Sequence, residues 1–136
     1  MLLPRLASVS LLFLLNLPQT GCQSFERQAD SAPRPARLNH VVLFTLHDPD
    51  DAEAFLAACN TRLQAIPAVT AYASGPPLPT NRETAMTDYD VGIYLGFNSR
   101  AAYENYLAHP SHEALVDAWQ ARIRRMRVID ILDETK

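Results

Sequence analysis

The first apolar run of the chain, Leu38–Leu46, is rich in β-branched and aromatic residues and predicts a strand that is apolar on both faces. A strand of this kind is covered on both sides. Alternation divides its residues between the two faces, with His40, Val42, Phe44 and Leu46 on one and Val41 and Leu43 on the other.

The residues after this strand predict a helix. Asp48-Pro-Asp-Asp51 is a helix start with acidic side chains in the first turn, where the helix dipole favours negative charge. Apolar residues then recur at intervals of three and four, and Pro67 ends the pattern. The resulting apolar stripe consists of Phe55, Leu56, Cys59, Leu63 and Ile66. We therefore interpret Cys59 as a small core residue rather than a nucleophile.

Two further strands are predicted, at Val69–Gly75 and at Tyr89–Phe97, with a proline-rich loop between them. In the second of these, Tyr89, Val91, Ile93, Leu95 and Phe97 share one face. Gly92 and Gly96 fall on the other face, where we expect something large to approach closely.

The C-terminal third predicts two helices and a strand. Asn98-Ser99 caps a helix that runs to about Ala108, and Pro110 begins a second helix that continues through Trp119 to Arg125. Arg122, Arg124 and Arg125 are interpreted as the last turn of this helix, where cations meet the negative end of the dipole. Val128–Leu132 is a short strand, and its pattern leaves open whether Asp130 points inward or outward.

The order of elements is strand, helix, strand, strand, helix, strand. This split βαβ pattern predicts an α+β, ferredoxin-like βαββαβ fold with a four-stranded antiparallel sheet and the helices on one face. The other sheet face is also apolar, so we expect a second copy of the same sheet to cover it and the protein to be a homodimer.

The N-terminus predicts export. Arg5 and the apolar run 6–15 are typical of a signal peptide, which we place at residues 1–21, and the run is too short to span a bilayer. Thr20-Gly21-Cys22 resembles a lipidation motif, although Gln19 stands where leucine is preferred. We predict that Cys22 carries lipid, that residues 22–37 are a flexible tether, and that the protein is anchored at the periplasmic face of an outer membrane. The alternative is an ordinary secretory leader with Cys22 as an unused thiol.

The composition is that of a globular domain, with 48% hydrophobic and 20% charged residues. A net charge of −3 and the lack of aromatic residues among the arginines at 122–127 argue against nucleic-acid binding.

Histidines and a tyrosine supply the candidate chemistry: Tyr106, His109 and His112 lie close in sequence, and His40 lies in the first strand. His112 is in the first turn after Pro110, where the helix dipole disfavours imidazolium, so a neutral His112 could act as a general base. These groups could instead hold a core together by hydrogen bonds, or form a small-molecule pocket. A third alternative is a metal site of three imidazoles from His40, His109 and His112, but no cysteine or suitably spaced acid supports it, and we predict no metal or other cofactor.

Several motifs, in this order and spacing, resemble the stress-responsive dimeric α/β-barrel (Dabb) family over Leu38 to about Asp133, and we place the domain at residues 38–134. They are Asn39-His40-Val-Val-Leu-Phe, Ile66-Pro-Ala-Val69, Gly75 before the proline loop, Tyr89-Asp-Val-Gly-Ile-Tyr, Tyr106-Leu-Ala-His109-Pro-Ser-His112 and Val128-Ile-Asp130. The resemblance implies a homodimer whose two sheets form a barrel. Monooxygenases and haem-degrading enzymes share this fold, but the histidine-proline motif favours the Dabb family and no haem-ligand signature is visible.

One plant member of that family, olivetolic acid cyclase, closes a polyketide thioester by an aldol reaction. The resemblance implies that its essential histidine corresponds to His112 and its assisting tyrosine to Tyr106, with His40 and Asp130 completing the site. We expect a largely apolar cavity between sheet and helices that binds a small hydrophobic molecule, with His40, Val42, Phe44 and His109 as ligand contacts. The alternatives are an aldol cyclase or lyase with His112 as general base, and a structural barrel with no ligand.

Overall fold

The computed structural model describes residues 34–135. The predicted signal peptide, Cys22 and most of the predicted tether therefore lie outside the described residues. No helix in the described range is both long enough and apolar enough to cross a membrane.

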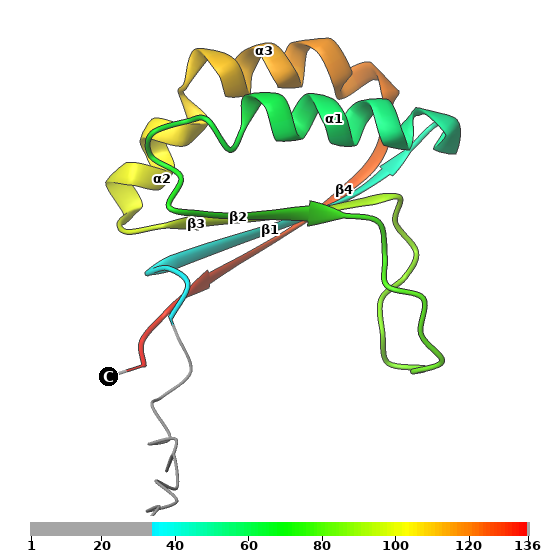
Figure 1. Ribbon diagram of the computed structural model, residues 1–136, viewed down its shortest axis with the longest axis horizontal. Helices are drawn as coiled ribbons and strands as arrows, with labels where there is room; N and C mark the ends of the chain where they lie inside the picture. Colours follow the sequence, from blue (N-terminus) through cyan, green and yellow to red (C-terminus); the bar gives the residue numbers. More distant parts are fainter. Residues whose placement is uncertain (1–33, 136) are drawn as a thin grey trace, which may run out of the picture. The chain divides into compact units, whose positions relative to one another are not determined.

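Four strands form one antiparallel sheet, and three helices lie on one of its faces (Figure 1). In chain order the elements are β1 (Leu38–Leu46), α1 (Ala52–Arg62), β2 (Ala71–Gly75), β3 (Val91–Phe97), α2 (Arg100–Leu107), α3 (Pro110–Trp119) and β4 (Ile123–Leu132), with short 3₁₀ turns at Pro49–Asp51 and Gln120–Arg122. The spatial order is β2-β3-β1-β4, so β1 lies between β3 and β4, which are far apart in sequence. The predicted ferredoxin-like fold is confirmed.

Local signals explain where the helices begin. The Ser99 hydroxyl accepts a hydrogen bond from the Ala102 N–H at 3.1 Å, which caps α2 as predicted. Pro110 is the first residue of α3. The first helix is shorter than its apolar stripe predicted, because α1 ends at Arg62 and the chain continues in turns. Leu63 and Ile66 still reach the core from these turns.

The core lies between the sheet and the helices. Its most buried large side chains come from β1, α1 and β3: Leu46, Phe55, Cys59, Val91, Leu95 and Phe97. Burial raises the pKa of the Cys59 thiol to about 12, so the thiol stays protonated. Cys59 is therefore a core residue, as its position in the helical stripe predicted.

The arginine cluster was predicted wrongly. α3 ends at Trp119, and β4 already begins at Ile123, so Arg124 and Arg125 lie in a strand rather than in the last turn of a helix. Pairing of β4 with the whole length of β1 outweighs the helix propensity of this segment. The Arg122 guanidinium instead lies 4.6 Å from the centre of the Trp119 ring and pairs with Asp51.

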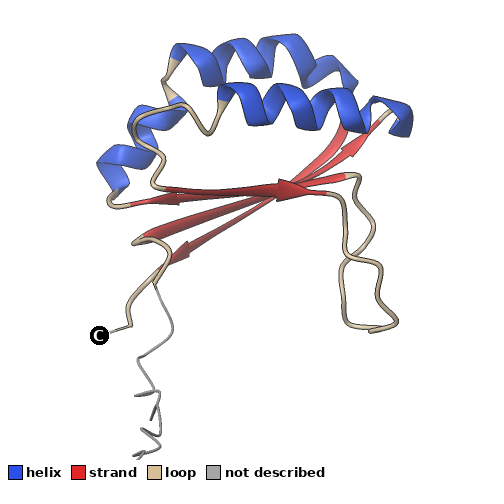
Figure 2. Cartoon of the chain, in the orientation of Figure 1, coloured by secondary structure: helices blue, strands red, loops and turns tan. Residues whose placement is uncertain are grey.

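The loop between β2 and β3 extends on the side of the sheet that carries no helix (Figure 2). One Asp88 oxygen accepts from Arg125 at 2.9 Å and the other from Arg127 at 2.7 Å, which fixes the loop to β4. The Tyr89 ring approaches Gly92 on this far face, where a Cβ on Gly92 would be 3.1 Å from it. The prediction that Tyr89 shares the face of Val91 was therefore wrong, because Tyr89 precedes the strand and does not follow its alternation.

The last residues of the predicted tether are packed against the domain. Ala36 is buried, and a Cβ built on Gly96 would lie only 2.6 Å from the Cβ of Ala36. The Arg37 carbonyl accepts a hydrogen bond from the Asp133 N–H at 2.8 Å. A close approach at Gly96 was expected from a large group, and the nearest atoms are instead the Cβ atoms of Ala36 and Ala71. Ala36 and Arg37 therefore pack against the sheet.

Candidate functional site

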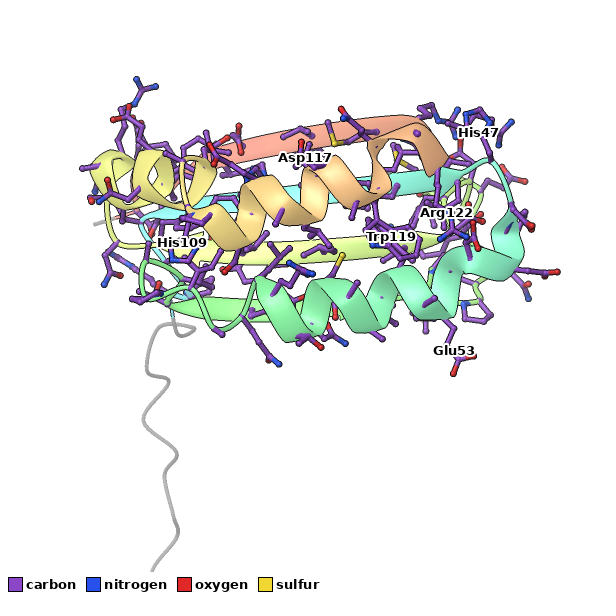
Figure 3. The ribbon with its side chains drawn as sticks, turned by 90° about the horizontal axis from the view of Figure 1, so that it is seen from above. His47, Glu53, His109, Asp117, Trp119 and Arg122 are labelled. Atoms are coloured by element: carbon purple, nitrogen blue, oxygen red, sulfur yellow. The ribbon has the colours of Figure 1, made fainter. Side chains whose placement is uncertain are left out.

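A cavity of about 460 Å³ lies under the helix layer, beside β1 and β4. Within the helix layer α3 lies beside α1. The view from above shows α1 on the β2 side of the sheet and α3 nearer to β4 (Figure 3). The cavity is lined by His40, Val42, Phe44, Phe55, Leu63, Tyr103, Tyr106, Leu107, His112, Leu115, Val116, Trp119, Gln120, Ile123, Met126 and Val128.

His40 and Asp130 lie within ion-pair distance of each other at one end of this cavity. The two residues are direct partners in the register of β1 and β4, so their side chains project on the same face of the sheet. His40 Nδ1 lies 2.5 Å from Asp130 Oδ1, and His40 is almost fully buried while the Asp130 side chain is 45% exposed. The sequence left the direction of Asp130 open, and the strand register turns it toward the helices.

Tyr103 belongs to the same end of the cavity and was missed by the sequence analysis. Its hydroxyl lies 3.5 Å from Asp130 Oδ2, and its ring centroid is 5.2 Å from that of His40. Tyr103 precedes Tyr106 by three residues in α2, which places both rings on one helix face. That spacing is the sequence signal that could have identified Tyr103.

Tyr106 and His112 meet across the kink at Pro110, with ring centroids 4.6 Å apart. His112 Nδ1 lies 3.0 Å from the Leu107 carbonyl oxygen and donates to it, so the neutral ring keeps an acceptor at Nε2. Burial lowers the pKa of His112, and the nearby His40 lowers it further, whereas the bond to Leu107 opposes the shift. The predicted neutral state is supported, but burial rather than the helix dipole is its first cause.

His109 is not among the residues that line the cavity. Its Nδ1 accepts a hydrogen bond from the Ser111 N–H at 3.1 Å, so the side chain caps α3, and Figure 3 shows it at the junction of α2 and α3. The proline after His109 explains this position, because it makes His109 the N-cap residue. Within residues 34–135 no group of three or more His, Cys, Asp or Glu side chains is arranged to hold a metal ion.

The opposite end of the cavity is mainly apolar, and Gln120 is its polar lining residue. Val42 and Phe44, both predicted as ligand contacts, line it from β1, while Phe55 and Trp119 line it from the helices. The Phe55 ring meets the Phe44 ring edge-on, with centroids 4.9 Å apart, and is tilted against the Trp119 ring, with centroids 5.0 Å apart, so the three rings make an aromatic wall. This wall and the polar groups lie at opposite ends of α3.

The cavity opens beside β4. Four of its lining residues are exposed large hydrophobics: Leu107 (39%), Val116 (41%), Met126 (56%) and Val128 (45%). They come from both sides of the gap between the helices and the edge strand. The sequence carries no signal for this opening, because the opening depends on how α3 is placed above the sheet.

The polar end offers both donors and acceptors of hydrogen bonds. Burial raises the pKa of Tyr103 and of Tyr106, so both hydroxyls remain protonated near neutral pH. The Tyr106 hydroxyl makes no hydrogen bond to another described residue, and neither does Nε2 of His40 or of His112. A bound molecule can therefore accept from a phenol and donate to an imidazole at this end.

Fold and cavity together define a ferredoxin-like α+β domain with a pocket between its sheet and its helices. Residues 38–133 match the model of the stress responsive A/B barrel domain, Dabb, and the chain belongs to this family. The family predicted from the sequence motifs is confirmed. None of the curated proteins compared matches the chain.

Solved structures show the same fold. A Dabb family protein with a ferredoxin-like fold from Mesorhizobium loti is 28% identical, with a TM-score of 0.59 over 72% of this chain and 97% of that chain. A dimeric ferredoxin-like protein from Thermobifida fusca is 23% identical, with a TM-score of 0.59 over 71% and 90%. The hydroxynitrile lyase from Passiflora edulis is 15% identical, with a TM-score of 0.62 over 76% and 99%.

Proposed function

We propose that the protein binds a small, mainly apolar molecule with a polar head group in the cavity under α3. The observation that carries this proposal is the division of the cavity into a polar end at His40 and His112 and an aromatic end at Phe44 and Trp119. Ligand pockets of soluble proteins have this character, with apolar walls and a few convergent polar groups.

The length of the cavity sets the size of the ligand. His112 and Trp119 are seven residues apart on α3, which is about 10 Å at the rise of an α-helix. His40 and Phe44 are four residues apart on β1, which is about 13 Å at the rise of a strand. A head group at the histidines and an unbranched chain of six to eight carbons, roughly, would span this distance.

The experiment uses Trp119, the single tryptophan of the chain, as an intrinsic reporter. A series of 2-alkanones of increasing length is titrated against the protein, and Trp119 fluorescence is followed. Affinity should rise with chain length until the cavity is full, because each buried CH₂ contributes about 0.8 kcal/mol.

Two variants separate binding in the cavity from general surface association. His112→Ala should weaken ketone binding with little change in melting temperature, because His112 is only partly buried. Leu78→Ala is the matched control, since Leu78 is 77% exposed and lies in the distant β2–β3 loop. Two results would contradict the proposal. Either no alkanone changes the fluorescence, or Leu78→Ala reduces the response as much as His112→Ala does.

A second candidate function is that of an enzyme of the aldol cyclase or lyase type. It is favoured by the contact of Tyr106 with a neutral His112, a pairing suited to proton transfer beside a carbonyl. The assignment of His112 as the general base remains a prediction from the resemblance to olivetolic acid cyclase. Because one protein of the same fold is a hydroxynitrile lyase, release of cyanide from an aromatic hydroxynitrile is a direct assay. Release that exceeds the uncatalysed rate and falls in Tyr106→Phe would support the enzyme.

We propose that the protein is a homodimer through the sheet face opposite the helices. This face carries Val41 and Leu43 from β1, and Ile129 and Ile131 from β4 are 45% and 53% exposed on it. Burying such a surface is favourable, and a second copy of the same face is the simplest partner. The description of relatives of the same fold as dimeric supports the proposal.

We also propose that the mature chain is a lipoprotein, exported and held by lipid on Cys22 at the periplasmic face of an outer membrane. The support is the sequence alone, namely the short apolar run followed by Gly21-Cys22 and by Gln23. In this arrangement the residues that precede the packed Ala36 connect the domain to the membrane.

A further inference from the structure

Two methionines lie in the described part of the chain, and both are exposed enough to meet an oxidant in solution. Met126 on β4 is 56% exposed, and Met86 in the β2–β3 loop is 49% exposed. The third methionine of the sequence, Met1, lies outside the described residues. Met126 lines the cavity, whereas Met86 is not among its lining residues. The same chemical change at these two side chains should therefore have different consequences.

The strand register places Met126 at the opening of the cavity. Met126 is the direct partner of Phe44 in the pairing of β1 with β4, so both side chains project on the helix side of the sheet. β4 is an edge strand, and no described strand covers its outer side. The face proposed for the dimer is the opposite one, which carries Ile129 and Ile131. Dimerisation through that face therefore leaves Met126 on the helix side.

The neighbours of Met126 on the cavity side are apolar. Phe44 lies across from it on β1, and Val128 lies two residues further along the same face of β4. A thioether suits these neighbours, because it is apolar and polarizable. Oxidation would convert it into a sulfoxide, which is polar and carries an oxygen that accepts hydrogen bonds. An apolar ligand that covers this oxygen would remove its water without supplying a hydrogen bond, and this costs free energy.

We propose that Met126 is a modification site, at which a peroxide forms methionine sulfoxide and thereby weakens the binding of apolar molecules in the cavity. This inference rests on the proposed ligand-binding function and adds the group through which that binding is regulated. The co-reactant is a peroxide, and methionine sulfoxide reductases provide the return to the thioether.

The oxidation balances with hydrogen peroxide as the oxidant. A lone pair of the Met126 sulfur forms a bond to one peroxide oxygen, and the O–O bond breaks. The proton on the transferred oxygen goes to the departing hydroxide, which leaves as water. The sulfur loses two electrons and the peroxide gains them.

Other groups that react with peroxide can be separated from Met126. Burial raises the pKa of the Cys59 thiol to about 12, so this thiol lacks the thiolate form that reacts. Cys22 lies outside the described residues, and it is common to the wild-type chain and to both variants below. A reaction at either cysteine therefore cannot produce a difference between those variants.

The experiment treats the full chain with hydrogen peroxide and measures sulfoxide at Met126 and at Met86 by peptide mass spectrometry. Trp119 fluorescence then gives the affinity for the 2-alkanone that binds the untreated protein most tightly. Oxidation should lower this affinity at least about fivefold, as expected when a polar group is covered without a partner. Treatment with methionine sulfoxide reductases of both stereochemical types should restore the affinity.

Two variants assign the effect to one side chain. Met126→Leu keeps an apolar side chain of similar volume and removes the sulfur. It should bind the alkanone nearly as well as the wild-type chain and should no longer respond to peroxide. Met86→Leu is the matched control, because Met86 has a similar exposure and does not line the cavity. It should keep the full response, and circular dichroism confirms that both variants are folded.

Ligand binding should in turn protect Met126, because the coupling between the two events is reciprocal. A saturating concentration of the alkanone should slow sulfoxide formation at Met126 and leave its rate at Met86 unchanged. Equal rates at Met126 with and without the bound alkanone would contradict the inference.

The remaining outcomes separate this inference from the proposed function. An unchanged affinity after complete oxidation of Met126, oxidation confined to Met86, or a loss of affinity that persists in Met126→Leu would overturn the role of Met126 and leave ligand binding intact. If no 2-alkanone binds even the untreated protein, the proposed function fails, and the present inference fails with it.

Discussion

Gly96 allows the segment before β1 to pack on the sheet, and replacing it by alanine should destabilise the domain. The new Cβ would lie 2.6 Å from the Cβ of Ala36, 3.0 Å from the Cβ of Ala71 and 3.1 Å from the Tyr94 hydroxyl. Carbon atoms in good contact are about 3.5–4.0 Å apart. A Cβ cannot rotate away, so the backbone at Ala36 or at Ala71 would have to move.

The cost should be about 1–3 kcal/mol, which is typical of overpacking in a well-packed region. For a domain of about 100 residues, each kcal/mol lowers the melting temperature by about 4–8 °C. Urea unfolding followed by circular dichroism measures the free energy directly. Two other strand glycines are controls, because a Cβ on Gly75 meets nothing within 4 Å and one on Gly92 meets only the ends of side chains. Gly75→Ala should be neutral or stabilising by up to about 1 kcal/mol, and Gly92→Ala should fall between the two.

A second substitution tests the stated cause. Ala36→Gly removes the atom closest to the new Cβ, so it should recover part of the stability lost in Gly96→Ala. The double variant should then be more stable than the sum of the two single effects predicts. Equal losses in Gly75→Ala and Gly96→Ala, or strict additivity with Ala36→Gly, would refute the packing argument.

Three further predictions concern the site, the dimer and the anchor. Burial lowers the pKa of His112 in the folded protein, so the unfolded chain binds the proton more readily. The contribution of neutral His112 to stability is therefore fully present above the unfolded pKa of about 6.5, and it falls as the pH decreases through that value. Urea unfolding at pH values on both sides of 6.5 should show this decline, and His112→Asn should reduce it; an unchanged decline would place its origin elsewhere. Val41→Glu should bury an unpaired charge in the proposed interface, at a cost of several kcal/mol, and sedimentation should show monomers or unfolded protein; a monomeric wild-type protein would exclude the interface. Cys22→Ser should shift the protein from the membrane fraction to a soluble or unprocessed form, and unchanged partition would remove the lipid anchor.

The pattern of apolar residues predicted the type and order of the main strands and helices because each has a strong period of its own. The boundaries depend on tertiary pairing, which the pattern does not contain. Arg124 and Arg125 illustrate the difference. They continue a helical pattern in sequence. In the structure this segment instead pairs along the length of β1, and Arg125 donates to Asp88.

The site was predicted in part for the same reason. His40, Val42 and Phe44 share a face by simple alternation, so their common place at the cavity followed from the sequence. The direction of Asp130 depends on the register of β4 against β1, and a shift of one residue would reverse it. Predicting Tyr103 would have required recognising that α2 presents two rings to the sheet. Predicting the cavity would have required knowing the height of α3 above the sheet.

The opening beside β4 has a consequence for the speed of ligand exchange. In a pocket enclosed on all sides, a molecule enters only when part of the protein unfolds or a segment swings aside, and its arrival is as slow as that event. Here Val116, Met126 and Val128 already form an exposed apolar entrance at the edge strand. Association should therefore be a single-phase process whose rate rises in proportion to ligand concentration without reaching a plateau, and substitutions that loosen the core should leave that rate unchanged.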